Sequence, residues 1–369
     1  MRIGVPAETQ PNERRVALVP EGVGKLKAAG CEILVQRGAG TSAQIPDAAF
    51  EAAGATLVAS AAEALGADVV LKVQRPSLEE AGQLRDGAVL VSFLATAASQ
   101  DLLAVLARRK VTAFAMELVP RTTKAQSMDA LSSQATIAGY KAVLVGADAM
   151  GRIIPMLTTA AGTLAPAKVF VVGAGVAGLQ AIATARRLGG IVSAFDVRTV
   201  VREQVQSLGA TFVEVAAVEG EGQGGYAKEL AAEQQQRVVA GVGEHAKGQD
   251  LIITTAQIPG RAAPRLLTAE AVRAMKPGSV IVDLAAESGG NCELTRMGEV
   301  VLAGGVTILG PVNLPATVPF HASQMYGRNV LTFVTYLLKD GALQLDLSDP
   351  ITGPMCVTHA GDLRTPKAA

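Results

Sequence analysis

The chain has 369 residues, which exceeds the ~250–300 at which one hydrophobic core stops growing, so two domains are expected. Hydrophobic residues make up 49% and charged residues 18%, which excludes general disorder. Lys plus Arg and Asp plus Glu each total 33, so no net charge attracts nucleic acid or an anionic membrane surface.

Short β-branched runs alternate along the chain with Ala- and Leu-rich segments of helical length, a pattern typical of βαβ units and parallel sheets. Near the N-terminus we expect strands over 2–5, 32–36, 69–72, 89–93 and 112–115, with helices over 21–29 and 99–109 between them. A second set of strands follows at 169–172, 191–196, 251–254, 280–283 and 306–309.

The apolar segment 330–339 is interpreted as a helix that returns to the first lobe, and 352–369 as a weakly ordered tail. The predicted fold class is therefore α/β, with two Rossmann-like doubly wound parallel-sheet domains separated by a cleft. The N-terminal domain is predicted to be discontinuous, with residues 1–135 plus 325–369. Residues 136–324 then form a nucleotide-binding Rossmann domain.

Cysteine spacing and apolar run lengths limit the other possibilities. Cys31, Cys292 and Cys356 lie far apart without CxxC or Cys/His spacing, so we expect buried structural thiols and no metal site. The N-terminus turns polar by Glu8, and no uncharged apolar stretch approaches the ~18–20 residues that span a bilayer. The sequence therefore predicts neither export nor a membrane span.

A glycine-rich turn, GAGVAG, joins the strand at 169–172 to a helical segment. Gly173 permits the tight turn, Gly175 lets a pyrophosphate approach the backbone, and Gly178 lets helix and strand pack closely. Amide groups at the helix start, where Val176 lies, can bind the phosphates. The order of strand, turn and helix predicts a dinucleotide site.

Asp196 ends the next strand, where a carboxylate can accept hydrogen bonds from the adenine ribose hydroxyls and repel a 2′-phosphate. We therefore favour NAD(H) over NADP(H) as the cofactor. Arg198 leaves the alternative open, because a nearby arginine can bind a 2′-phosphate. A second alternative is a tight βαβ turn that binds no nucleotide.

Several local sequences resemble the NAD(H)-binding subunit of proton-translocating nicotinamide nucleotide transhydrogenases. They are RTTKAQSMDALSSQ at 121–134, DVR at 196–198, GYAKE at 225–229, TTAQIPGR at 254–261 and DLAAESGGN at 283–291. The resemblance covers nearly the whole chain. It implies that Val197, Arg198, Gly225, Ala256 and Gln257 also take part in cofactor binding.

The same resemblance implies a catalytic loop at the nicotinamide end of the cofactor. Its residues are Arg121, Gln126, Asp129 and Ser132, and Gln126 is expected to contact the nicotinamide ribose and orient the ring. Tyr226, which follows the glycine-rich segment GEGQGG at 220–225, is expected to close over the cofactor as part of a mobile lid. The alternative for this segment is a solvent-exposed connector.

The resemblance further implies hydride transfer from NADH to NADP⁺, with proton translocation in the membrane-spanning partner subunits. Because the chain has one dinucleotide fingerprint, NADP(H) is expected on the NADP(H)-binding domain of a partner subunit. The protein is then expected to be a cytoplasmic homodimer, attached peripherally to the inner face of the cell membrane through its partners. No nucleic acid is expected to bind.

Alanine dehydrogenases share this fold and provide the alternative function. Arg15 lies where they bind the substrate carboxylate, and Lys72 lies where they have a catalytic lysine. Ala95, however, stands where they have a catalytic histidine, and Glu287 where they have an aspartate on the nucleotide side. Loss of the acid/base group argues against amino-acid oxidation, so Lys72 and Arg15 are interpreted as structural residues that hold the cleft together. An NAD(H)-sensing module without chemistry remains a third hypothesis.

Overall fold

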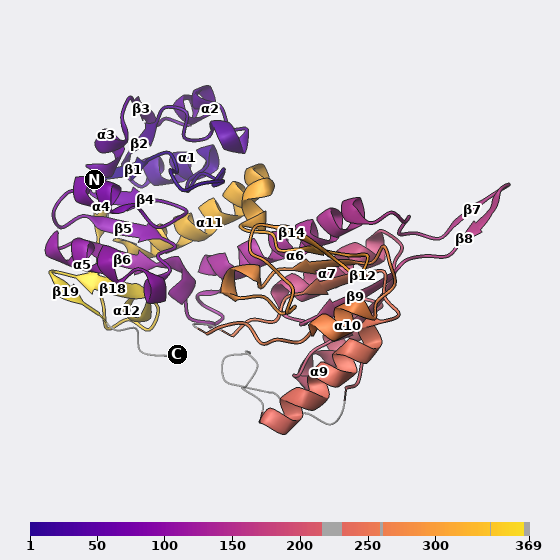
Figure 1. The fold of residues 1–369 in the computed structure, drawn as a ribbon. Coiled ribbons are helices and arrows are strands. Elements are labelled where there is room, and N and C mark those ends of the chain that lie inside the picture. The colour runs from indigo at the N-terminus through magenta and orange to yellow at the C-terminus, as the bar shows by residue number, and fades with distance from the viewer. Residues whose placement is uncertain (216–230, 259–260, 340, 365–369) are drawn as a thin grey trace. The chain divides into compact units, whose positions relative to one another are not determined.

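The computed structural model describes residues 1–215, 231–258, 261–339 and 341–364 (Figure 1). Contacts divide the chain into two compact units, 1–134 with 315–369 (unit 1) and 135–314 (unit 2). The second boundary precedes the predicted one at 324, because Pro319–Leu337 forms a single helix, α11, whose buried side chains belong to the core of unit 1.

The parallel sheet of unit 1 has the order β3-β2-β1-β4-β5-β6, continued at one edge by β18 and β19. The order reverses between β1 and β4, which makes this sheet doubly wound. The parallel strands are β1 Arg2–Val5, β2 Glu32–Gln36, β3 Thr56–Val58, β4 Val69–Leu71, β5 Val89–Ser92 and β6 Thr112–Ala115.

Helices cover both faces of this sheet, so β4, β5 and β6 are buried throughout. One core contains α1 Pro20–Ala28 and α11, and the other contains α4 Leu78–Gln83 and α5 Gln100–Arg108. The remaining elements of unit 1 are η1 Thr41–Ala43, α2 Asp47–Ala52, α3 Ala61–Leu65, η2 Thr96–Ala98, η3 Met116–Leu118, η4 Gln126–Met128, β16 Leu338–Lys339 and β17 Ala342–Leu343.

The prediction of a weakly ordered tail over 352–369 is wrong for the described residues up to 364. Thr352–Met355 forms α12, Cys356–His359 forms β18 and Asp362–Leu363 forms β19. β18 pairs antiparallel with β6, and the hydroxyl of Thr358 donates to the Val111 carbonyl at 2.8 Å. This pairing orders the segment because it buries Cys356 and Val357 in the cores of unit 1. Residues 365–369 lie outside the described residues.

Unit 2 repeats the same sheet topology, with the order β11-β10-β9-β12-β13-β15 and an antiparallel strand, β14, at one edge. The strands are β9 Lys168–Val172, β10 Ile191–Phe195, β11 Thr211–Phe212, β12 Leu251–Thr254, β13 Val280–Asp283, β14 Val300–Ala303 and β15 Val306–Leu309. Two doubly wound parallel sheets confirm the predicted fold class. The cleft between the domains stays a prediction.

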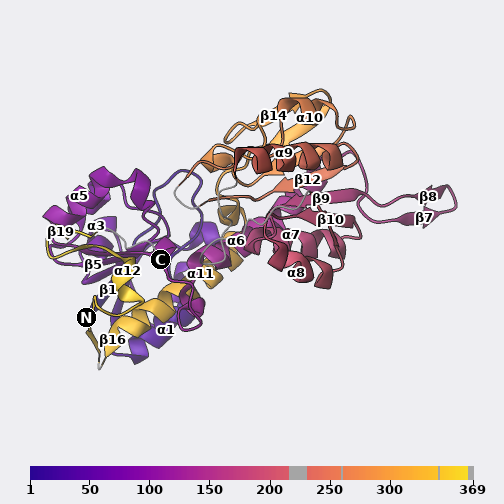
Figure 2. The same ribbon diagram turned by 90° about the horizontal axis from the view of Figure 1, so that it is seen from below.

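Two layers of helices cover the sheet of unit 2 (Figure 2). α7 Val176–Arg187 and α8 Arg202–Ser207 pack on one face, and α9 Ala232–Ala246 and α10 Ala269–Arg273 on the other. The remaining elements are η5 Thr199–Val201, η7 Ala286–Ser288, α6 Ala130–Ala149, η8 Leu314–Thr317, β7 Leu157–Thr159 and β8 Gly162–Leu164. α6 and η8 contain the two points at which the chain passes between units.

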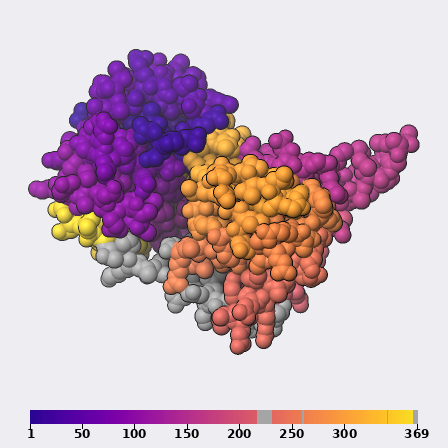
Figure 3. Space-filling model, viewed as in Figure 1, coloured from indigo at the N-terminus to yellow at the C-terminus, as the bar shows by residue number. Residues whose placement is uncertain are grey.

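The hairpin of β7 and β8 was not anticipated from the sequence. It projects from unit 2 and stands clear of the surface of that unit (Figure 3). Both strands are exposed along their length, and the apolar side chains of Met156, Leu157 and Leu164 face solvent. Apolar side chains gathered on a thin projection are unusual for the surface of a monomer.

The cysteines agree with the expectation that their thiols are buried. Cys31, Cys292 and Cys356 are free and buried, and burial raises the pKa of the Cys356 thiol to about 11. Within the described segments of the chain, no helix combines the length and hydropathy needed to cross a bilayer.

Candidate functional site

The turn between β9 and α7 gives each of its three glycines a different steric environment. Gly173 has a φ of +100°, and a Cβ there would lie 2.5 Å from the Thr255 hydroxyl. A Cβ on Gly178 would lie 1.8 Å from the Gly173 carbonyl oxygen. A Cβ on Gly175, the residue before α7, would meet no protein atom within 4 Å. Gly173 and Gly178 are therefore required by the turn itself, whereas Gly175 borders open space at a helix N-terminus, where a phosphate fits.

Asp196 follows β10 and holds this turn in place. Its Oδ2 accepts a hydrogen bond of 2.7 Å from the Ala174 amide, next to Gly173. The Arg198 side chain donates to both carboxylate oxygens, at 2.9 Å from Nε and 2.7 Å from Nη2. The carboxylate thus lies beside the glycine turn and also binds the guanidinium that could have attracted a 2′-phosphate. This pairing weakens the interpretation of Arg198 as a 2′-phosphate ligand.

The segment after β12 forms a second side of the same region. Ala256 donates its amide to Asn291 Oδ1 at 3.0 Å, and its carbonyl accepts from Asn291 Nδ2 at 2.8 Å. The Thr255 hydroxyl donates to the Gly173 carbonyl at 3.0 Å, and Nε2 of the Gln257 side chain donates to the Leu284 carbonyl at 3.1 Å. The predicted residues Gly173, Ala256 and Gln257 therefore gather at the carboxyl ends of β9, β12 and β13.

Three residues of this region were not predicted from the sequence as site residues: Thr255, Asn291 and Asp283. Asp283 is fully buried at the end of β13 and accepts hydrogen bonds from the Thr254 and Thr295 hydroxyls. All three hold neighbouring loops through hydrogen bonds. A polar residue at or directly after the end of a buried strand was the signal for Asp283 and Thr255, but Asn291 acts through contacts that local sequence does not reveal. Gly225 and Tyr226, also predicted to bind the cofactor, lie outside the described residues.

The predicted catalytic loop, residues 121–132, belongs to unit 1. Ala125 and Met128 are buried in the core of that unit, whereas Arg121 and Gln126 are exposed. Asp129 accepts hydrogen bonds from the Ser132 amide at 2.9 Å and the Ser132 hydroxyl at 2.6 Å. This is the geometry of a side chain that caps the N-terminus of α6. The structure therefore brings Asp129 and Ser132 together as a helix cap.

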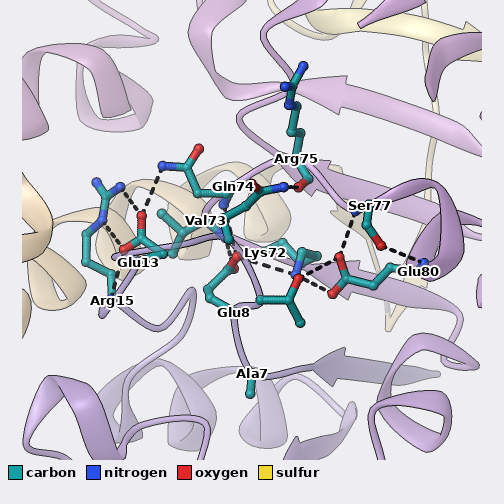
Figure 4. Close-up of polar contacts among 12 residues, drawn as sticks. Ala7, Glu8, Glu13, Arg15, Lys72, Val73, Gln74, Arg75, Ser77 and Glu80 are labelled. Carbon is teal, nitrogen blue, oxygen red and sulfur yellow. Dashed lines mark hydrogen bonds and ion pairs between the residues drawn. The ribbon is translucent and has the colours of Figure 1, made fainter. Parts of the chain in front are cut away.

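A cluster of buried charges lies after the strands where the sheet order of unit 1 reverses (Figure 4). Lys72 follows β4 and is fully buried, with its Nζ 2.9 Å from Glu80 Oε1 and 3.4 Å from Glu8 Oε2. Burial raises the pKa of Glu8, and the charge of Lys72 opposes that shift. Lys72 is therefore paired with two carboxyl groups of the chain itself.

Arg15 is paired within the same unit (Figure 4). Its Nε lies 2.8 Å from Glu13 Oε1, its Nη2 lies 2.6 Å from Glu13 Oε2, and its Nη1 donates to Gln134 at 2.8 Å. A two-point contact of this kind fixes the guanidinium in one orientation. Arg15, like Lys72, already has an internal carboxylate partner, which supports a structural role for both residues.

Ala95 lies in the loop after β5 with a φ of +49°, a left-handed conformation that is uncommon for alanine. The neighbouring Leu94 and Thr96 amides donate to the Glu117 carboxylate. Burial raises the pKa of Glu117, although these backbone hydrogen bonds oppose the shift. The methyl side chain of Ala95 has no proton to give or take.

Comparisons with known families cover both units. The model of the alanine dehydrogenase/PNT N-terminal domain matches residues 4–138, and that of the alanine dehydrogenase/PNT C-terminal domain matches residues 142–366. An NAD(P) transhydrogenase alpha subunit from Rhodospirillum rubrum is 48% identical, over 99% of this chain and 98% of its own. An alanine dehydrogenase of Mycobacterium tuberculosis is 33% identical, over 100% and 96% of the two chains.

Solved structures give the same ranking. The transhydrogenase from Sinorhizobium meliloti matches with a TM-score of 0.91 and 47% identity, over 99% of this chain and 100% of that chain. An L-alanine dehydrogenase matches with a TM-score of 0.80 and 30% identity, over 99% and 97% of the two chains. Similarity to transhydrogenases therefore exceeds similarity to alanine dehydrogenases in both sequence and structure.

Proposed function

This chain belongs to the alanine dehydrogenase/PNT family, and we propose that it is the NAD(H)-binding subunit of a proton-translocating transhydrogenase. The observation that carries the proposal is the absence of a proton-transfer group at Ala95, combined with the internal pairing of Arg15 and Lys72. Oxidation of an amino acid needs a general acid or base, and loss of that group costs ~10²–10⁴ in rate. Hydride transfer between two nicotinamides needs neither.

The residues of unit 2 fit NAD(H) in two respects. Open space at Gly175, before the first turn of α7, suits a pyrophosphate, and backbone amides at a helix N-terminus bind phosphate oxygens. Asp196 provides a carboxylate beside that turn for the adenine ribose. The cofactor, when bound, supplies the hydride at C4 of its nicotinamide.

In unit 1 the proposed task is orientation of the nicotinamide. The carboxamide of Gln126 can donate to and accept from ribose hydroxyls without adding a formal charge. Asp129 and Ser132 fix the loop end that follows Gln126 through their helix cap. Rate then depends on holding the donor C4 within ~3–3.5 Å of the acceptor C4, which is a matter of positioning.

The remaining components are assigned to partners. NADP(H) binds to a domain of a membrane-spanning partner subunit, and the same partners translocate protons. The chain is cytoplasmic, attached peripherally to the inner face of the membrane through those partners. It is a homodimer, and the exposed apolar hairpin of β7 and β8 supports this proposal, since a second copy could cover Met156 and Leu164.

A simple assay separates this function from amino-acid oxidation. The purified chain alone, supplied with NAD⁺ and alanine, is expected to give no NADH absorbance at 340 nm. Addition of the NADP(H)-binding partner and NADP⁺ to the NADH-loaded chain is expected to produce NADPH. Turnover of alanine by the chain alone would overturn the proposal.

Two glycine substitutions should have opposite consequences. Gly178→Ala forces a Cβ against the Gly173 carbonyl and should destabilise unit 2 by about 1–3 kcal/mol. Gly175→Ala meets no protein atom, so the unfolding temperature should hold, while NADH affinity falls about tenfold or more because the methyl group occupies the pyrophosphate space. Calorimetry and titration of NADH fluorescence measure the two effects. An unchanged affinity for NADH in Gly175→Ala would show that the pyrophosphate does not bind at this turn.

Cofactor choice is predicted to depend on Asp196. NADH should bind much more tightly than NADPH, because the buried carboxylate would lie beside a phosphate dianion. Asp196→Asn keeps the shape of the side chain and an acceptor for the Ala174 amide, so the turn should stay folded. The difference in affinity between NADH and NADPH should become smaller. Fluorescence titration of both nucleotides tests this, and equal dissociation constants for the unmodified protein would contradict the assignment.

A further inference from the structure

One face of α11 contacts the predicted catalytic loop on both sides of Gln126. Asn329 and Tyr336 are seven residues apart, so they lie two turns apart on the same face of this helix. Asn329 contacts the loop just after Gln126, at Ser127, and Tyr336 contacts it just before Gln126, at Lys124. Gln126 itself is exposed, so the direction of its side chain depends on how its backbone is held.

The first contact is a buried side-chain amide. Asn329 Nδ2 donates to the Ser127 carbonyl at 2.8 Å, and the side chain is 8% exposed. Its Oδ1 is buried and has no hydrogen-bond partner among the residues that the structure describes. An unpaired buried acceptor destabilises a fold. An apolar residue would therefore suit the core better at this position, and the contact with the loop is what the amide adds.

The second contact is a chain of three polar side chains. Lys124 Nζ donates to the Tyr336 hydroxyl at 3.0 Å and lies 4.9 Å from the centre of the Tyr336 ring. The Tyr336 hydroxyl donates to Asp349 Oδ2 at 2.6 Å, and Asp349 Oδ1 accepts the Ile351 amide at 2.8 Å. The Tyr336 hydroxyl raises the pKa of Lys124. The loop is thus connected to α11 and to the segment that precedes α12.

Two buried side chains, one on each side of Gln126 and Ser127, also hold the loop. Ala125 and Met128 belong to the core of unit 1 that also contains α11, and the Met128 amide donates to the Ala125 carbonyl at 2.8 Å. Gln126 and Ser127 are therefore the outward side of a single short turn, η4. The turn is held on both sides of Gln126, and this restricts the backbone that carries the Gln126 side chain.

We propose that Asn329 and Tyr336 are positioning residues that fix the backbone on either side of Gln126 and thereby direct its carboxamide. The inference rests on the proposed function, in which Gln126 orients the nicotinamide. Neither residue is assigned a contact with the cofactor. Their effect passes through Ser127 and Lys124 to the loop.

Two variants and a control test this proposal in the full-length, NADH-loaded protein. Tyr336→Phe keeps the ring but removes the hydroxyl that joins Lys124 to Asp349. Asn329→Leu removes the donor to Ser127 together with the unpaired buried oxygen, so global stability should hold. Thr332→Val is the control, because the Thr332 hydroxyl donates only within α11, to the Arg328 carbonyl at 2.8 Å.

The first measurement is the rate of trypsin cleavage after Arg121, which is exposed in this loop. Loss of one net hydrogen bond should raise the cleavage rate about fivefold in Tyr336→Phe and in Asn329→Leu, with no change in Thr332→Val. The second measurement is hydride transfer to NADP⁺ on the partner. In both variants kcat should fall about tenfold, because ring placement is impaired, while the Kd for NADH stays within about twofold.

Unchanged cleavage in both variants would overturn the anchoring of the loop. Faster cleavage with an unchanged kcat would overturn the positioning role, since the loop would then be loosened without consequence for transfer. A loss of NADH affinity equal to the loss of kcat would also overturn it. If the proposed function is wrong, the unmodified protein will show no hydride transfer to NADP⁺. The trypsin cleavage rates would still show whether Asn329 and Tyr336 hold the loop.

Discussion

Gln126→Ala is expected to slow hydride transfer about 100-fold while the Kd for NADH changes by less than about threefold. The side chain is exposed at the start of η4 and lies outside the core of its unit, so its removal should not disturb folding. Pyrophosphate and ribose contacts in unit 2 would supply most of the binding energy. Loss of the carboxamide would then affect the placement of the nicotinamide ring rather than overall affinity.

Stopped-flow transfer to an NADP⁺ analogue on the partner, combined with NADH fluorescence titration, separates rate from affinity. Thr123→Ala is a suitable control, since Thr123 is an exposed residue of the same loop with no assigned contact to the cofactor. If NADH binding collapsed in Gln126→Ala and the rate in the bound state were untouched, Gln126 would contribute to affinity only. The orienting role would then be wrong.

Lys72→Met should lower the free energy of unfolding by about 3–5 kcal/mol, because it leaves two buried carboxylates without their cation. Lys72 is fully buried, and its Nζ contacts both Glu8 and Glu80. Methionine approximates the length of the lysine side chain and leaves little empty volume. The loss therefore reports on charge rather than packing, and the thermal transition of unit 1 in calorimetry measures it.

The pH dependence of that loss has a definite sign. Burial already raises the pKa of Glu8, and removal of Lys72 should raise it further, since the lysine charge opposes the shift. A raised carboxyl pKa favours the folded state at low pH, so the deficit of Lys72→Met should shrink as the pH falls from about 8 towards 5. A constant deficit over this range would contradict the ionic explanation.

Lys25→Met provides the matched control for Lys72→Met. Lys25 forms a 2.8 Å ion pair with Glu21 on α1, but both side chains are exposed. Exposed ion pairs contribute little because water solvates each partner after the other is removed. The unfolding temperature of Lys25→Met should therefore stay close to that of the unmodified protein.

The sequence predicted the elements whose signals are local. The strands Arg2–Val5, Leu251–Thr254 and Val280–Asp283 begin and end at the residues predicted from the sequence. The turn at Gly173 and Gly178 was also predictable, since a motif of strand, glycine turn and helix imposes steric requirements that only glycine meets. The helix cap of Asp129 and Ser132 was not predicted, although an aspartate just before a helical segment is a local signature of a cap.

Elements that depend on distant partners could not be predicted. β18 was interpreted as part of a weakly ordered tail, yet it is ordered by pairing with β6, far away in the sequence. The role of Asn291 depends on its contact with the backbone of Ala256. The two contacts of α11 with the loop likewise join residues about 200 positions apart, such as Asn329 and Ser127. Local patterns carry no information about such pairs.

The most direct test of the proposed function is transfer of deuterium between nucleotides. The chain is loaded with NADH that carries deuterium at both C4 positions and is mixed with the NADP(H)-binding partner and NADP⁺, and the NADPH formed is analysed by mass spectrometry. Direct transfer between nicotinamides predicts that the deuterium released from NADH appears in NADPH and that no hydrogen from solvent enters C4. Unlabelled NADPH, or no NADPH with a partner known to bind NADP⁺, would contradict the account.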